Sequence, residues 1–203
     1  ALYWSTGGSD GRWRKDTGWM YGLPCTSSWY GVGCGHLTSA GTVVSLKLNS
    51  NSITGSLPTQ IGLMTALTNG LFLQFNALSQ QLPTQLGQLT KLGQLYAFSN
   101  SISGSIPSQI GAMIALTQAF LQSNELRGSV PSQIGSLGPH MVPDHGSQPT
   151  PQPRDDDGDG THLVSGLQFL VLDDNRLESA LPLTMCNLTG LEVFSVSSNN
   201  LSG

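Results

Sequence analysis

The stretch LGQLYAFSNSISGSIPSQIG, residues 92–111, is repeated with small changes along most of the chain. Relative to Asn100, apolar residues, a glycine and a proline stand at fixed offsets: Leu92, Leu95, Ile102, Gly104, Ile106, Pro107 and Ile110. The same pattern surrounds six asparagines, which are 25, 24, 24, 51 and 24 residues apart: Asn51, Asn76, Asn100, Asn124, Asn175 and Asn199. A repeat of this length indicates a solenoid, in which each copy forms one coil.

Each copy has a pattern that favours a short strand followed by a turn. Leucines such as Leu71 and Leu73 recur with the period of two that marks a strand with one buried face. The asparagine that follows can donate to and accept from backbone groups that the turn leaves unpaired, so we expect the six asparagines to be structural. Glycine and proline in GSLP, GSIP and GSVP then favour an extended return leg, and TQIG or SQIG a short helical turn.

A single copy cannot fold alone. About seven inward apolar positions contribute roughly 1.5 to 3 kcal/mol each, whereas ordering about 24 residues costs on the order of 1.5 kcal/mol per residue. Stacking supplies the missing burial and hydrogen bonds. The sequence therefore predicts a curved solenoid with a parallel sheet on its concave side.

The copies resemble the plant-type leucine-rich repeat, LxxLxLxxNxLxGxIPxxLGxL, over roughly three-quarters of the chain. This resemblance implies an α/β solenoid that forms a right-handed superhelix. It also implies a parallel concave β-sheet, short 3-10 or helical turns on the convex side, and often a second strand near the GxIP turn.

Residues 1–41 do not fit the repeat and carry all four tryptophans, Trp4, Trp13, Trp19 and Trp29. They resemble the N-terminal cap of plant-type and protist leucine-rich-repeat proteins, in which a short helix and a Trp-rich loop cover the first coil. We expect the tryptophans to form the core of this cap, with a contact role for one of them as the alternative.

The two cysteines of such caps are bridged, so the resemblance implies a disulfide between Cys25 and Cys34. Such a bond would stabilise the cap by roughly 2 to 3 kcal/mol in the chain-entropy model, and it implies an oxidising compartment. The alternative is a metal pair with His36, although two thiols and one imidazole fall short of a closed zinc set.

The repeats divide into two blocks. Residues 42–138 hold four units, and residues 164–203 hold a fifth unit and an incomplete sixth. In the second unit Gln80 replaces the usual glycine, which should not break the coil. Because the chain stops within a unit, and solenoids normally end in a cap, we expect it to be a fragment of a longer protein.

Residues 139–163 form an inserted loop between the two blocks. Five prolines and few apolar residues describe a segment that projects from the solenoid and cannot pack a core. The loop contains the first half of a calcium-binding pattern: Asp155, Asp157, Asp159 and Thr161. The bidentate acid expected at the twelfth position is absent, since Gly166 stands there. The alternatives to a calcium cofactor are a solvated acidic loop or a metal site of His140, His145 and His162.

The composition argues against several classes of protein. Charged residues make up 10% of the chain and the net charge is −4, which argues against nucleic-acid binding. No apolar run approaches the length of a membrane span, and the first residues have no leader pattern, so any signal peptide is already missing. We find no nucleophile elbow or phosphate loop and expect no enzymatic activity.

Three further sites can be named from the sequence. Cys186 falls where other units have glycine; we expect a small buried thiol, with a partner beyond Gly203 as the alternative. Asn187 and Asn200 open N-x-S/T sequons and are candidate glycosylation sites in a secreted eukaryotic protein. Asn200 directly follows the inward Asn199, so its side chain should face outward.

Outward strand positions are where a partner would bind. In units two to four, the residue four positions before the asparagine is aromatic. Neighbouring strands would place these aromatic residues about 4.8 Å apart. We expect a ligand-binding surface there, because exposed aromatic rings are favoured at recognition sites. Its predicted residues are Phe72, Tyr96, Phe120, Gln94, Gln118 and Phe98, with Gln74, Gln122 and Phe75 nearby and an acidic edge at Asp173 and Asp174. The alternative is that the rings only stack on one another.

Two functions are compatible with these observations. The first is a secreted or cell-surface recognition module that binds a protein, peptide or glycan on a rigid concave face. The repeats resemble those of receptor-kinase ectodomains and polygalacturonase-inhibiting proteins, and this resemblance implies the first function. The second is a structural or adhesive surface protein that assembles with other chains, with the acidic loop as a calcium-dependent tether.

Overall fold

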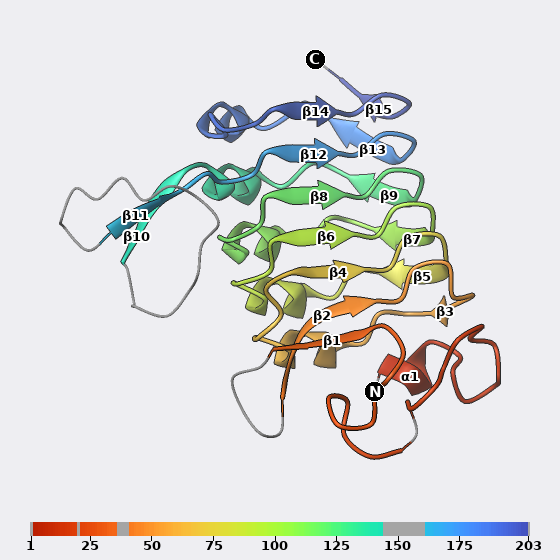
Figure 1. Ribbon diagram of the computed structural model, residues 1–203. Coiled ribbons are helices and arrows are strands. Elements are labelled where there is room, and N and C mark those ends of the chain that lie inside the picture. The colour runs from red at the N-terminus through yellow and green to blue at the C-terminus, as the bar shows by residue number, and fades with distance from the viewer. Residues whose placement is uncertain (1, 20, 36–40, 144–160, 203) are drawn as a thin grey trace.

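The computed structural model of the protein describes residues 2–19, 21–35, 41–143 and 161–202, and the side chains of the same residues except 141–143 and 161–164. The coils are stacked in chain order from the N-terminal segment to the C-terminal end, as Figure 1 shows. Each complete coil has strands on two sides and a short 3-10 helix on a third. The chain is therefore the α/β solenoid that the repeat predicted.

The longer of the two stacked sheets has seven strands, in the order β1-β2-β4-β6-β8-β12-β14. They are β1 (Val32–Gly35), β2 (Thr42–Lys47), β4 (Gly70–Phe72), β6 (Gln94–Tyr96), β8 (Gln118–Phe120), β12 (Phe169–Val171) and β14 (Val193–Ser195). Neighbours from β2 onward are parallel, whereas β1 pairs with β2 in the antiparallel direction. β8 and β12 pair directly across the inserted segment, with Phe120 beside Val171. One continuous sheet therefore spans all the coils.

A second sheet runs along the flank in the order β15-β13-β9-β7-β5-β3. Its strands are β3 (Thr54–Gly55), β5 (Ala77–Gln81), β7 (Ser101–Gly104), β9 (Glu125–Gly128), β13 (Arg176–Ser179) and β15 (Asn200–Leu201). This sheet corresponds to the second strand that the resemblance implied near the GxIP turn.

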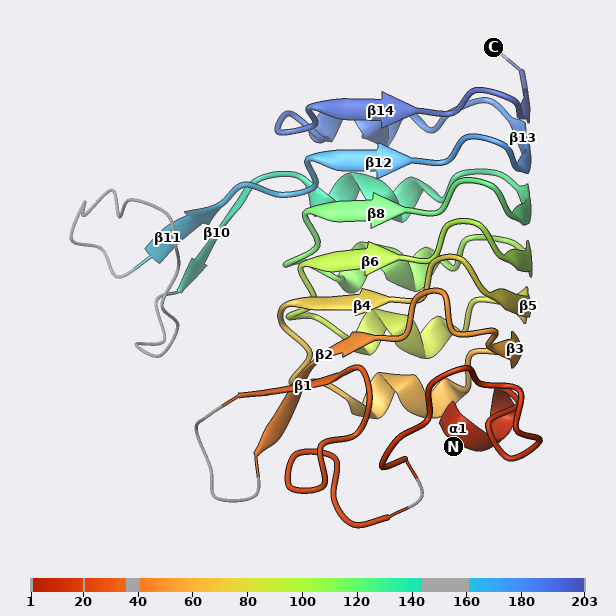
Figure 2. The same cartoon turned by 45° about the vertical axis from the view of Figure 1, so that its right-hand side comes forward.

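Short 3-10 helices lie behind the seven-stranded sheet in Figure 2. The described residues hold η1 (Thr59–Leu63), η2 (Thr84–Gln88), η3 (Ser108–Ala112), η4 (Ser132–Leu137) and η5 (Leu183–Asn187). A proline in an extended conformation directly precedes each of them: Pro58, Pro83, Pro107, Pro131 and Pro182. The fixed φ of proline keeps the return leg extended until the helical turn begins.

The core is one continuous column of apolar side chains between the two sheets and the 3-10 helices. Each of the first four coils contributes apolar side chains from its strands and from its helical turn, and in the second coil these are Leu71, Leu73, Leu78, Leu82, Leu86 and Leu89. Ala119 is also fully buried, so the small residue of the fourth coil keeps its inward position. Because each coil covers the apolar face of its neighbour, burial depends on stacking.

The ladder asparagines join each coil to the one before it. Asn100 Nδ2 donates to Leu73 O and to Ala97 O, each at 3.1 Å. Asn100 Oδ1 accepts from Leu78 N at 3.0 Å. The same three contacts recur at Asn76, Asn124, Asn175 and Asn199. Each asparagine therefore satisfies backbone groups of two successive coils.

The N-terminal segment takes the place of a preceding coil for Asn51. Asn51 Oδ1 accepts from Lys15 N at 2.7 Å, and Asn51 Nδ2 donates to Lys15 O at 2.9 Å. The helix α1 (Leu2–Ser5) lies beside β3, whose Thr54 N donates to Thr6 O at 3.1 Å. The segment thus satisfies both the ladder and the edge of the flank sheet at the first coil.

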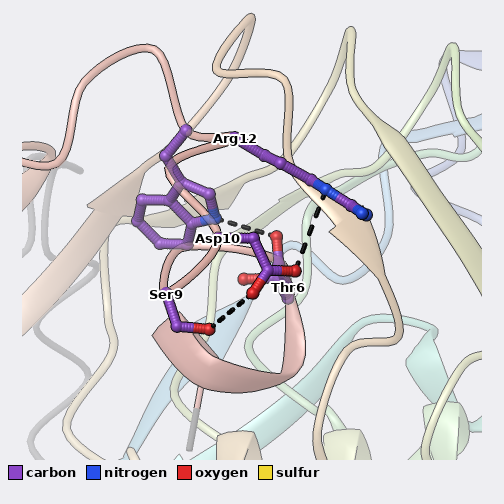
Figure 3. A network of polar contacts seen from close by, with 5 residues as sticks. Thr6, Ser9, Asp10 and Arg12 are labelled. Carbon is purple, nitrogen blue, oxygen red and sulfur yellow. Dashed lines mark hydrogen bonds and ion pairs between the residues drawn. The ribbon is translucent and has the colours of Figure 1, made fainter.

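A compact turn follows α1. Figure 3 shows Asp10 between Ser9 and Arg12: Ser9 Oγ donates to Asp10 Oδ1 at 3.2 Å, and Arg12 Nε lies 3.8 Å from Asp10 Oδ2. Trp13 Nε1 donates to Thr6 O at 2.9 Å, which joins the end of the turn to the residue directly after α1. The Arg12–Asp10 pair is exposed and contributes little to stability.

The cap core differs from the sequence prediction at one tryptophan. Trp13 and Trp19 are buried against Tyr3, and Trp29 is partly buried beside Trp19. Trp4, however, is 61% exposed, because it stands on the solvent side of α1. The expected disulfide between Cys25 and Cys34 is present and joins the cap loop to β1.

The base of the insertion is ordered, which the sequence did not predict. β10 (His140–Pro143) pairs with β11 (Thr161–Val164) in an antiparallel hairpin that projects from the solenoid in Figures 1 and 2. Leu137 O accepts from Leu167 N at 2.7 Å, so the chain leaves and re-enters the coil at almost the same point.

The expectation of a buried thiol at Cys186 is wrong. The glycines at this position pack against the next coil, since a Cβ on Gly87 would collide with Gln109 O and one on Gly111 with Gln133 O. In the described residues no 3-10 helix follows η5, so Cys186 has room for its side chain and is exposed.

Left-handed backbone conformations recur at two positions of the repeat, the first in all six coils and the second in the first five. The residue directly before each ladder asparagine has φ from 51° to 58°: Ser50, Phe75, Ser99, Ser123, Asp174 and Ser198. The second position has φ from 65° to 75° and is glycine in three coils but Gln80 and Ser179 in two others. Left-handed conformations cost non-glycine residues about 1 to 2 kcal/mol, so the non-glycine residues at both positions are strained, and among them Phe75 carries the bulkiest side chain.

Replacing Asn100 by alanine should destabilise the solenoid by roughly 2 to 4 kcal/mol, because Leu78 N, Leu73 O and Ala97 O lose their partner in the interior. Urea unfolding of Asn100→Ala measures the loss. Ser101→Ala, at an exposed neighbouring position, serves as the control and should unfold like the parent chain. Equal unfolding of both variants would show that the ladder has no energetic role.

Replacing Gln80 by glycine should stabilise the protein by about 1 kcal/mol, since glycine has no Cβ penalty at a φ of 65°. Gly128→Ala is the reciprocal variant: a Cβ there meets only Ser105 Cβ at 3.9 Å, so its cost should come from the backbone conformation alone. Thermal unfolding measures both changes. A destabilised Gln80→Gly would mean that the Gln80 side chain stabilises more than its backbone strain costs.

Candidate binding surface

The outer face of the seven-stranded sheet is the candidate binding surface. The flank sheet and the 3-10 helices lie on other sides of the coils, as Figures 1 and 2 show. We call this surface the open face and define it by the outward residues that stand six, four, two and one positions before each ladder asparagine. In the second coil these are Gly70, Phe72, Gln74 and Phe75.

Aromatic rings cross the open face from strand to strand. The ring centroids of Phe72 and Tyr96 are 5.1 Å apart, and those of Tyr96 and Phe120 are 4.8 Å apart, both in edge-to-face geometry. Phe169, which the sequence analysis did not include, continues the row at 6.3 Å from Phe120. The rings are half-buried because they cover one another, so the alternative of mutual stacking describes part of the arrangement.

A second aromatic pair extends the row along the strand direction. Phe98 lies 6.4 Å from Tyr96 and 5.0 Å from Phe75. Phe75 is 56% exposed and has a φ of 58°, a conformation that bulky residues rarely adopt. Serine or aspartate stands at this position in the other coils. Phe75 therefore combines backbone strain with an exposed ring, which is a common signature of a functional position.

Glutamine amides lie between the rings. Gln118 Oε1 accepts from Tyr96 Oη and from Gln94 Nε2, the latter at 3.4 Å. Burial raises the pKa of Tyr96, so its hydroxyl stays protonated and acts as a donor. The Oε1 atoms of Gln74 and Gln122 are buried without a partner among the described residues. The middle of the open face is thus uncharged.

The fifth coil supplies the acidic edge that the sequence predicted. Asp173 Oδ1 accepts from Ser195 Oγ at 2.6 Å and from Ser197 N at 2.7 Å, and Ser197 Oγ also donates to it. Partial burial works against ionisation of Asp173, but these hydrogen bonds outweigh it, and its pKa lies below the ordinary value. Asp174 is exposed and accepts from Ser123 Oγ at 3.5 Å.

The predicted ligand-binding residues share one surface. The structure brings together Phe72, Tyr96, Phe120, Gln94, Gln118 and Phe98, and it adds Phe169 and Phe75. Counting back from the ladder asparagine by six, and not only by four, would have found Phe169 from the sequence. Whether these residues bind a ligand stays a prediction.

The predicted metal sites can only partly be placed. Asp155, Asp157 and Asp159 lie outside the described residues, and Thr161 begins β11. His36 and His145 also lie outside them. Within the part of the chain that the structure describes, no group of three or more His, Cys, Asp or Glu side chains could hold a metal ion.

Comparisons with known proteins agree with this fold. No family model and no curated protein matches the sequence. Among solved structures, a chain of the BIR3–SERK2 complex from Arabidopsis thaliana matches all of this chain and 92% of its own length, with a TM-score of 0.67 and 26% identity. The ectodomain of GASSHO1/SCHENGEN3 from Arabidopsis thaliana, in complex with CASPARIAN STRIP INTEGRITY FACTOR 2, matches 88% of this chain, with a TM-score of 0.64 and 27% identity.

A TDR receptor matches 74% of this chain, with a TM-score of 0.59 and 27% identity. This chain spans only 21% of the TDR receptor and 20% of the GASSHO1/SCHENGEN3 ectodomain. The repeat motif, the asparagine ladder, the capping disulfide and these structural matches together show that the chain has the leucine-rich-repeat fold and is similar to plant receptor ectodomains of that fold.

Proposed function

We propose that the protein is an extracellular recognition module that binds a protein, peptide or glycan partner on its open face. The observation that carries the proposal is the continuous aromatic surface, in which half-buried rings stand among uncharged amides. Aromatic residues are enriched at the centres of binding interfaces, and charged residues are depleted there. HAESA, a receptor kinase that has the same fold, was solved in complex with a peptide hormone and a co-receptor.

The binding mechanism would be docking onto a preformed surface. Parallel pairing fixes the strands, and edge-to-face contacts between neighbouring rings hold Phe72, Tyr96 and Phe120 in place. A rigid surface loses little conformational entropy on binding, which favours affinity. The module needs no catalytic group for this role.

An extracellular location is part of the proposal. The Cys25–Cys34 disulfide is typical of proteins that fold in oxidising compartments. Both sequon asparagines, Asn187 and Asn200, are exposed and accessible to a glycosyltransferase. In the described residues no helix has the length and apolarity that crossing a bilayer requires.

Expression through a eukaryotic secretory pathway should yield a glycoprotein whose electrophoretic mobility increases on enzymatic deglycosylation. Asn187→Gln and Asn200→Gln should each remove one step of the shift, because both sites are exposed. Asn69→Gln is the control, since Asn69 does not begin a sequon. A secreted protein without any shift would contradict the glycosylation sites but not the binding surface.

Removing two rings should abolish partner binding with little loss of stability. Peptides selected on the immobilised protein from a displayed random dodecapeptide library serve as probes, and their affinities are measured by calorimetry. Phe72→Ala with Tyr96→Ala should weaken binding by at least about 30-fold, which corresponds to one hot-spot residue. The melting temperature should fall by only a few degrees, because the two half-buried rings contribute little core packing.

Leu63→Ala is the matched control. Leu63 is an exposed apolar residue of η1, away from the open face, so its loss should leave affinity unchanged. If the selected peptides bind the double variant as well as the parent protein, the open face is not the binding site.

A further inference from the structure

Charge on the open face is confined to the first and the fifth of its six coils, which we call its two charged ends. Among the outward residues of all six coils, the only basic side chain is Lys47, on the first coil. The only acidic ones are Asp173 and Asp174, on the fifth coil. The second, third and fourth coils between them carry only aromatic, amide, glycine and serine residues.

The charged groups at both ends are available to a ligand. Lys47 is exposed, and within the described residues neither ion pair of the molecule involves it. The hydrogen bonds from Ser195 and Ser197 converge on Oδ1 of Asp173, so they hold the carboxylate in place and engage only that one oxygen. Asp174 stands next to it and is exposed.

The distance between the ends sets the length of a matching ligand. Lys47 on β2 and Asp173 after β12 are separated by four strand spacings, because the strand order is β2-β4-β6-β8-β12. At about 4.8 Å per spacing this is about 19 Å, which an extended chain covers in about six residues. The separation exceeds the Debye length of about 8 Å at physiological ionic strength, so each end acts independently on the group it meets.

We propose that the open face binds an extended peptide segment of opposite terminal charges, with an acidic residue over Lys47, a basic residue over Asp173 and Asp174, and apolar residues between them on the aromatic row. This inference rests on the proposed function and adds the charge pattern and length of the partner. The charge complementarity supports a peptide over a neutral glycan, because a glycan without ionised groups leaves both ends unpaired. Running the peptide along the stack places its side chains over successive coils.

The test uses the displayed random dodecapeptide library on the immobilised protein and compares the sequences that are enriched. The parent protein should enrich peptides with one acidic and one basic residue separated by about four to six mainly apolar residues. Either order of the charges is compatible, since the peptide can lie in either direction.

Two variants change one end each. Lys47→Glu should replace the acidic residue of the enriched peptides by a second basic residue. Asp173→Asn with Asp174→Asn should remove the preference for the basic residue, while the amide oxygen introduced at position 173 can still accept from Ser195 and Ser197. Parent-selected peptides should bind the double amide variant about two- to fivefold more weakly, the range for an exposed ion pair, and less so at high salt.

Matched controls place the same charge changes elsewhere. Lys91→Glu and Glu178→Gln alter exposed residues outside the open face and should leave the enriched pattern unchanged. If the enriched peptides fail to bind the Phe72→Ala, Tyr96→Ala variant but do not carry one acidic and one basic residue, this inference is wrong and the proposed function stands. The same conclusion follows if Lys47→Glu enriches the same peptides as the parent protein. No enrichment over the Phe72→Ala, Tyr96→Ala variant would overturn both.

Discussion

The contact on which this structure depends is the asparagine amide that binds the backbone of two successive coils. Asn100 satisfies Leu73 O, Ala97 O and Leu78 N at once, and the same three groups recur from coil to coil. Such an amide matches the turn because it carries donor and acceptor on one short side chain. The N-terminal segment offers Lys15 N and Lys15 O to Asn51, so even the first coil completes the contact.

The open face follows from this contact. Since each coil is fixed in register on the one before it, residues at equal offsets from their asparagine become neighbours across the sheet, as Tyr96 and Phe120 do. The rings then shield one another, which reduces the cost of placing apolar surface in water. Phe75 departs from this arrangement: it is strained and half in solvent, and its ring rests on Phe98 alone among its aromatic neighbours.

Sequence reasoning predicted the fold because the repeat encodes it redundantly. The leucine spacing, the asparagine and the proline each fix a different part of the coil, and the chain is the α/β solenoid they indicated. Three features that the repeat does not encode were not predicted. The β10–β11 hairpin has no periodic sequence pattern, and the exposure of Trp4 depends on which side of α1 packs against the cap. Cys186 is exposed because, among the described residues, no 3-10 helix covers it. Ligand binding by the predicted surface residues stays a prediction, since nothing in a repeat encodes a partner.

The junction of the insertion has a consequence of its own. Leu137 and Leu167 are hydrogen-bonded across it, and β8 still pairs with β12 as if the intervening residues were missing. The entropic cost of closing a loop grows only slowly with loop length. Inserted segments of very different lengths at this junction should therefore lower the free energy of unfolding by similar amounts. Evolution can therefore replace the inserted segment by a different one without changes in the coils on either side. A protein engineer could use the same junction to insert a fluorescent reporter.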